Sequence, residues 1–170
     1  IGFFYNDNIN DIKASLVFRN IGFQIKPYNE VNEKLPFEIN MGISQKLENA
    51  PIIYHVTFEN LQKWPIGISN PSRIITDLDG NITEENISFF NEILRHTILG
   101  VELFPESFFN IQLGYSFRRS EELRILEQRN FSGISFGFGM KFNKLRFNYC
   151  HSRYSSASNV NFIGLQLDLN

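Results

Sequence analysis

The sequence is poor in cysteine, in excess basic charge and in long apolar runs. One Cys among 170 residues excludes a disulfide within the chain and a zinc site built from several cysteines. With 16 Lys and Arg against 18 Asp and Glu, the net charge of -2 provides no basic surface for nucleic acid. The apolar runs end after about five residues, far below the ~20 that a membrane-spanning helix needs. We therefore expect no nucleic-acid partner and no transmembrane helix.

What the sequence does have is phenylalanine, with 18 residues, and a period of two in its apolar positions. Successive side chains of a strand point to opposite faces, so a strand with one apolar face is apolar at every second residue. Ile39, Met41 and Ile43, for example, alternate with polar residues or glycine. The same alternation marks residues 35–46, 52–59, 109–118, 134–142, 145–150 and 163–169, and more weakly 12–20 and 95–104. The pattern predicts eight strands of about ten residues each.

The expected connections between these strands alternate in length. The long connections are residues 21–34, 61–94, 120–131 and 152–160, and the short ones are residues 47–50, 105–107 and 143–144. Long loops on one side and tight turns on the other are typical of outer-membrane barrels. The strand length agrees, because a tilted membrane-spanning strand takes ~9–11 residues whereas strands of soluble proteins peak near ~5–6.

We therefore predict an all-β fold, an antiparallel up-and-down transmembrane β-barrel in the bacterial outer membrane. Its apolar face contacts lipid and its polar face lines the lumen. Aromatic residues near strand ends are expected to form girdles at the two membrane interfaces: Tyr54, Trp64, Phe104, Phe108, Phe109 and Phe142. Six charged residues are expected to face the lumen and pair across it: Glu38, Glu59, Glu102, Arg118, Lys141 and Arg146. The period alone leaves open a lipocalin-like barrel or a β-sandwich, in which the apolar face points inward.

The chain begins inside this pattern. Residues 1–5 form a short apolar stub, which is followed by the polar turn NDNIND and the first full strand. We interpret the stub as the end of a ninth strand, so that further N-terminal strands of the same barrel precede Ile1. On this interpretation residues 1–170 are the C-terminal part of a single outer-membrane β-barrel domain.

The longest connection, residues 61–94, carries the one helical signal. Asn81 and Glu84 have the spacing of a capping box, and Glu85 adds a favourable charge to the first helical turn. An apolar stripe with helical spacing follows: Ile87, Phe89, Phe90, Ile93 and Leu94. We expect a short helix in a long extracellular loop, which covers or plugs the barrel mouth or docks a partner.

No arrangement of residues in the sequence indicates catalysis. Cys150 is the lone thiol, and no G-x-S-x-G, H-E-x-x-H or P-loop motif occurs. Asp77–Gly80 (DLDG) resembles part of a calcium loop but lacks further oxygen ligands at the required spacing, so we interpret it as a turn. The three histidines have no second ligand at metal spacing: His55, His96 and His151. We predict a protein that is not an enzyme, with no catalytic, cofactor-binding or metal site.

Two further features are interpreted structurally. Gly133, Gly137 and Gly139 share the polar side of one predicted strand, where they leave room in a crowded lumen or mark bends. The segment 118–129 (RRSEELRILEQR) mixes both signs of charge and indicates a solvated loop with internal ion pairs.

Three stretches, in chain order, resemble a known family. The first, MGISQKLENAPIIYHVTFENLQKW, has a G-I-S-x-x-L turn, then A-P, and a strand that ends in L-Q-x-W. The second, RHTILGVELFPESFFNIQLGYSFRRSEEL, matches at Arg95, His96, Gly100, Val101, Glu102, Gly114, Tyr115, Arg118, Arg119, Glu122 and Leu123. The third, beginning FSGISFGFG, continues through a hairpin to a final strand. Together they resemble the PorQ family of the Bacteroidetes type IX secretion system.

The resemblance covers residues 35–170 and implies a FadL-like barrel of about fourteen strands. It implies a non-enzymatic component of the type IX protein secretion system, which anchors the cell-surface attachment complex through extracellular loops. The implied partners are proteins of the PorU, PorV and PorZ kind, and the sortase chemistry belongs to PorU. Residues 155–158 depart from the family's pattern, which leaves the loop functions open. The alternatives are a FadL-like transporter of hydrophobic molecules and a soluble barrel that binds a small ligand.

Overall fold

A computed structural model describes most of the chain. It covers residues 1–25, 35–68, 75–76, 82–83, 87–123, 132–153 and 158–168, with the backbone alone described at 75–76 and 82–83. These residues form one nine-stranded antiparallel sheet, a separate two-stranded ribbon and two short helices. No helix among them is long and apolar enough to cross a membrane.

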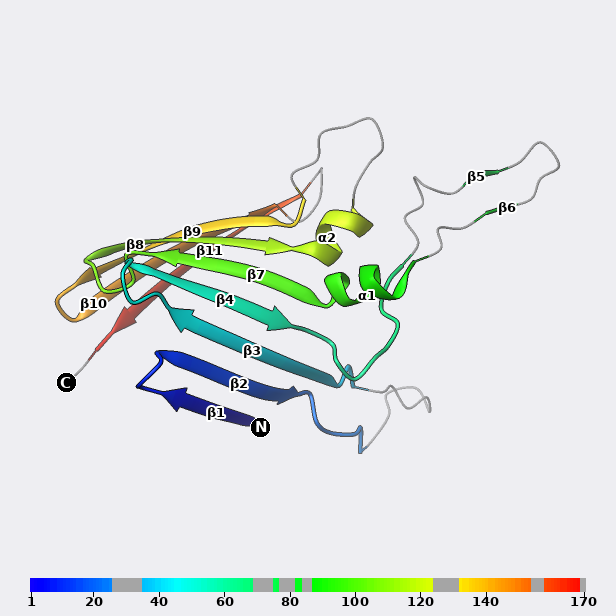
Figure 1. The fold of residues 1–170 in the computed structure, drawn as a ribbon, viewed down its shortest axis with the longest axis horizontal. Helices are drawn as coiled ribbons and strands as arrows, with labels where there is room; N and C mark the ends of the chain where they lie inside the picture. Colours follow the sequence, from blue (N-terminus) through cyan, green and yellow to red (C-terminus); the bar gives the residue numbers. More distant parts are fainter. Residues whose placement is uncertain are drawn as a thin grey trace.

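The large sheet follows the order of the chain, since its neighbouring strands are successive strands in the sequence, apart from the ribbon (Figure 1). Its strands are β1 (Gly2–Asp7), β2 (Ile12–Arg19), β3 (Glu38–Lys46), β4 (Ile52–Phe58), β7 (Thr97–Leu103), β8 (Phe109–Ser116), β9 (Ile134–Phe142), β10 (Leu145–Arg153) and β11 (Asn159–Leu167). The ribbon pairs β5 (Ile75–Thr76) with β6 (Ile82–Thr83). The predicted all-β, up-and-down arrangement is confirmed, and the N-terminal stub is part of strand β1. The sheet is open, with β1 and β11 at its edges.

The strands are shorter than predicted, at 6 to 9 residues. Strand β8 ends at Ser116, although the alternation continues to Arg118, because helix α2 (Phe117–Glu122) begins there. The Ser116 hydroxyl accepts a hydrogen bond from the Arg119 N–H at 3.5 Å, which satisfies one of the free amides at the helix start. The expected position of Arg118 on a lumen-facing strand is therefore wrong.

The connections sort by length, as predicted. Short turns link β1 to β2, β3 to β4, β7 to β8 and β9 to β10 at one end of the sheet, at the left of Figure 1. Asp11, Phe104 and Asn143 in these turns have φ angles of 51° to 57°, a left-handed conformation that suits tight turns. The strand ends that flank the longer connections lie at the opposite end. Helix α1 (Phe89–Arg95) precedes β7 there, and α2 follows β8, so the two helices lie side by side and in contact.

The register places most apolar positions of the sheet on one face and most polar positions on the other, although Phe4 of β1 and Phe162 of β11 lie on the polar side. Val101, for example, pairs with Tyr54 on one side and with Leu113 on the other. One residue earlier, Gly100 pairs with His55 and with Gly114. We call the first side the apolar face and the second the polar face.

The apolar face is exposed. Leu113, Phe136 and Leu165 are 49%, 46% and 71% exposed, and the one buried hydrophobic side chain among the described residues is Ile66. In the part of the chain that the structure describes, the sheet is a single layer and no second sheet covers this face. The fold therefore presents a wide hydrophobic surface and contains almost no hydrophobic core of its own.

Candidate functional site

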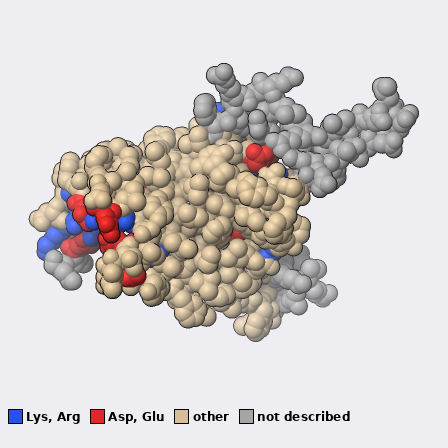
Figure 2. All heavy atoms as spheres, viewed as in Figure 1, with Lys and Arg blue, Asp and Glu red and all other residues tan. Residues whose placement is uncertain are grey.

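Aromatic rings pack against each other along the apolar face. Phe138 on β9 lies 6.0 Å from Phe109 on β8, and 6.0 Å and 5.4 Å from Phe147 and Tyr149 on β10, between ring centroids. Cross-strand aromatic pairs of this kind stabilise neighbouring strands. Figure 2 shows few charged side chains on the visible face except at the short-turn end. The visible face between the two ends is thus largely uncharged.

The aromatic residues predicted for the girdles lie mainly near the ends of the sheet. Near the short turns, the rings of Phe108 and Phe142 meet edge to face at 5.0 Å, and both side chains are more than half exposed. At the helix end, Trp64 is 47% exposed and lies 5.7 Å from Phe89. Tyr54 is half-buried and its hydroxyl hydrogen-bonds to Gln45 on β3. Aromatic side chains therefore mark both ends of the strands.

Four of the charged residues predicted for the lumen pair with near neighbours in the described part of the chain, and pairing across a lumen stays a prediction because the described sheet is open. Glu38 lies 3.6 Å from Arg19 on the adjacent strand, and Glu102 lies 3.9 Å from the His55 ring. The Arg118 Nε donates to Glu122 four residues later at 3.1 Å, which is one of the ion pairs expected within residues 118–129. Each of these ion pairs thus joins two residues on adjacent strands or within one helix.

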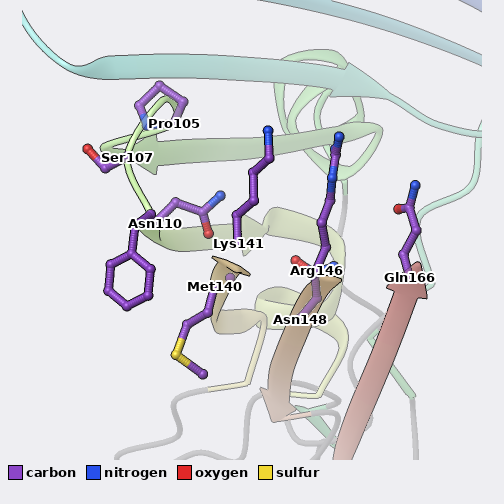
Figure 3. Close-up of a pocket in the computed structure, with 10 residues that line it drawn as sticks. Pro105, Ser107, Asn110, Met140, Lys141, Arg146, Asn148 and Gln166 are labelled. Atoms are coloured by element: carbon purple, nitrogen blue, oxygen red, sulfur yellow. The ribbon is translucent and has the colours of Figure 1, made fainter. Parts of the chain in front are cut away.

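Arg146 and Lys141 occupy opposite positions on β10 and β9. Arg146 forms an ion pair with Asp168 at 3.1 Å, just beyond the end of β11. The side chains of both cations point to the polar side, whereas Met140 points the other way (Figure 3). With Gln166 and Asn148 they line a hollow of about 170 Å³ on the polar face.

Glycines make room on this face at the positions where the sequence predicts it. A Cβ atom on Gly137 would lie 2.7 Å from the Tyr149 carbonyl oxygen, and one on Gly139 would lie 2.4 Å from Asn110 Oδ1. The third glycine differs from the prediction, because Gly133 lies in the turn before β9 with φ +90°. A side chain there would be strained and would meet the Ser116 carbonyl oxygen at 2.5 Å.

A buried ionic cluster, which the sequence did not reveal, joins the two helices. Arg95 is completely buried, donates from Nη1 to the Ile68 carbonyl oxygen at 3.0 Å, and lies 3.8 Å from Glu122 on α2. Glu92, also buried, accepts hydrogen bonds from the backbone N–H groups of Ile66 and Gly67. Glu92 and Arg95 are three residues apart and therefore share one helix face. This spacing is the feature of the sequence that could have indicated the cluster.

Helix α1 therefore differs from its prediction in two respects. Ser88, not Asn81, is its N-cap, accepting a hydrogen bond from the Asn91 N–H, and residues 82–83 form strand β6. The apolar stripe is divided between two environments: Phe89 and Phe90 are 72% and 68% exposed, whereas Ile87, Ile93 and Leu94 are half-buried. Ionic and backbone hydrogen bonds hold the buried side of this helix, and its aromatic side remains accessible.

Glu59 follows β4 and approaches this end of the sheet. Burial raises the pKa of its carboxyl group, and the nearby guanidinium groups of Arg118 and Arg119 oppose that effect. Its backbone carbonyl hydrogen-bonds to Nδ1 of His96 at 2.6 Å. Glu59 thus belongs to the helix end of the molecule, where it meets both helices.

The histidines and the cysteine are dispersed. His55 lies on the polar face, His96 is the buried C-cap of α1, and His151 lies on the apolar face beside Phe136. Cys150 is a free, partly buried thiol on the polar side of β10. Among the described residues, no three His, Cys, Asp or Glu side chains are grouped to hold a metal ion.

Several predicted features lie outside the described residues. They are the DLDG turn at residues 77–80, the residues proposed for a capping box (Asn81, Glu84 and Glu85), residues 124–129 of the mixed-charge segment and residues 155–157. Comparison of the chain with protein-family models, with curated proteins and with solved structures found no match.

Proposed function

We propose that this chain forms part of the wall of an outer-membrane β-barrel, with its apolar face toward lipid. The observation that carries the proposal is the exposed apolar face, which extends over all nine strands and is banded by aromatic residues. In an outer-membrane barrel, apolar side chains face lipid, aromatic girdles lie at both interfaces, and long loops and short turns lie on opposite sides. The open edges of β1 and β11 support pairing with further strands of the same barrel, since a spanning sheet must close.

We further propose that the protein is a non-enzymatic component of the type IX secretion system. It anchors the cell-surface attachment complex, including proteins of the PorU, PorV and PorZ kind, at the end of the sheet that carries the long connections. The resemblance of residues 35–170 to the PorQ family supports this role. The exposed rings of Phe89, which lies beside Trp64, and of Phe90 offer a surface for a partner at that end. The charged polar face gives no support to the alternative, transport of hydrophobic molecules.

Two experiments test these proposals separately. Fractionation of cells that express the full-length protein should place it in the outer membrane, with release only by detergent; recovery in the aqueous fraction would contradict the barrel. Mild solubilisation should then bring down partners of the PorU or PorZ kind. A Phe89→Ser, Phe90→Ser double variant should remain in the membrane but recover less partner. A lone barrel, or equal recovery by the variant, would contradict the anchoring role.

A further inference from the structure

Two cations lie opposite each other in the hollow on the polar face. Lys141 on β9 is the register partner of Arg146 on β10, and Figure 3 shows both side chains pointing in the same direction. Like charges at directly opposed positions destabilise a strand pair. Asp168 neutralises Arg146, but within the described residues no ion pair or hydrogen bond engages the Lys141 ammonium group. The hollow therefore retains a positive charge that does not serve the stability of the sheet.

Two amide oxygens converge beside these cations. Gly139 pairs in register with Asn110 on β8 and Asn148 on β10. The position of a Cβ on Gly139 lies 2.4 Å from Asn110 Oδ1 and 2.9 Å from Asn148 Oδ1, so both oxygens point over the glycine. The missing side chain of Gly139 thus leaves room for these two amide oxygens, and all three residues line the hollow.

The orientation of the Asn110 amide follows from its other partner. Its Nδ2 donates to Glu102 Oε1 at 2.7 Å, which directs Oδ1 away from that carboxylate. Asn110 Oδ1 is buried and has no hydrogen-bond partner among the described residues. Because this oxygen is buried, a ligand in the hollow does not reach it, and the exposed Asn148 amide is the acceptor that a ligand can use there.

These observations define the chemistry of a ligand. We propose that the hollow binds a small soluble anion that also carries hydroxyl groups, such as a sugar phosphate or a sugar acid. The anionic group meets Lys141 and Arg146, and a hydroxyl group donates to the exposed amide of Asn148. The hollow lies on the face opposite the apolar one, so the ligand enters from water and not from the bilayer. The site does not depend on the proposed role in secretion.

Isothermal titration of the full-length, detergent-solubilised protein tests the site. The probes are glucose 6-phosphate and glucuronate, with glucose as the neutral control. We expect saturable binding of at least one anion and none of glucose. Lys141→Gln should weaken that binding by about tenfold, the effect of losing one hydrogen bond to a charged group. Lys13→Gln is the matched control, because Lys13 lies on the polar face of β2.

A second variant tests recognition of the hydroxyl group. Asn148→Ala should reduce the preference for glucose 6-phosphate over inorganic phosphate while leaving the affinity for phosphate unchanged. Gel mobility before and after heating verifies that each variant folds. Binding of neither anion, equal losses in K13Q and K141Q, or an unaltered preference in N148A would overturn the proposal.

Discussion

The imidazole of His96 stacks on the indole of Trp64, with centroids 4.5 Å apart and ring planes 8° apart. His96 is buried at the end of α1, and its Nδ1 is tied to the backbone of Glu59. The stack therefore joins the segment after β4 to the helix that precedes β7. It lies at the proposed partner-docking end of the sheet.

Replacing Trp64 should loosen that connection. Aromatic pairs contribute about 0.5–1.5 kcal/mol beyond the area they bury, so Trp64→Leu should lower the free energy of unfolding by about 1 kcal/mol. Urea unfolding in phospholipid vesicles, followed by circular dichroism, measures the change. Phe23→Leu is the control, since Phe23 is 83% exposed. Equal effects of the two variants would show that the stack contributes nothing specific.

Removing the buried cation between the helices should have a larger effect. Arg95→Met removes a completely buried guanidinium together with its 3.8 Å pair to Glu122 and its hydrogen bond to Ile68, and breaking a buried ion pair costs about 3–5 kcal/mol. Because Arg118 still pairs with Glu122, the loss should lie at the lower end of that range. The same unfolding experiment should show a loss of about 3 kcal/mol. Arg19→Met, which breaks an exposed pair with Glu38, should cost about 0–1 kcal/mol. A loss no larger than that of R19M would rule out a structural role for the cluster.

A charge on the apolar face distinguishes lipid from water as its surroundings. If this face meets the bilayer, Leu113→Arg in the middle of β8 should cost about 2–4 kcal/mol of stability in vesicles. Gln112→Arg introduces the same charge one residue earlier, on the polar face, and should change stability little. Comparable effects for L113R and Q112R would count against a lipid-facing sheet.

The raised pKa of Glu59 predicts a pH dependence of stability. Because burial disfavours the charged carboxylate, the folded state binds the proton more tightly than the unfolded state, whose pKa is near 4.5. The penalty is absent at pH values well below 4.5, grows as pH rises from about 4.5 to the folded-state pKa, and is constant above it. Glu59→Gln should therefore stabilise the protein at pH 7 relative to the wild type, with the gain lost at pH 3.5. Glu48→Gln, in an exposed turn, makes the same change in charge; a gain of equal size there would contradict the role of burial.

The alternation of side chains was enough to predict the strands, because a period of two is a local property of the chain. Ile134 to Phe142 shows this best, since its predicted and observed bounds coincide. Helix α2 was missed because Phe117 and Arg118 continue the alternation, and only the Ser116 cap shows where the strand ends.

The ionic partners could not be read from the sequence. Arg95 pairs with Glu122, and Arg146 pairs with Asp168. Each pair joins two different elements of the fold, and it forms only when the strands that carry these elements are paired in register. A pattern of alternation shows which face a charge occupies, but it does not specify which residue of the next strand lies beside it. The local ion pairs were therefore not predicted, and pairing across a closed lumen stays a prediction.

The pairing order of the sheet has a consequence for how it assembles. Most strands pair across connections of modest length, so β1 to β4 and β7 to β11 can each grow by successive hairpins. The joint between them is different, because Phe58 pairs with Thr97 across the longest connection in the sheet. We expect the two groups of hairpins to form early and the pairing of β4 with β7 to follow in a single slower step. The contact between α1 and α2 should form together with that pairing, because both helices lie next to it.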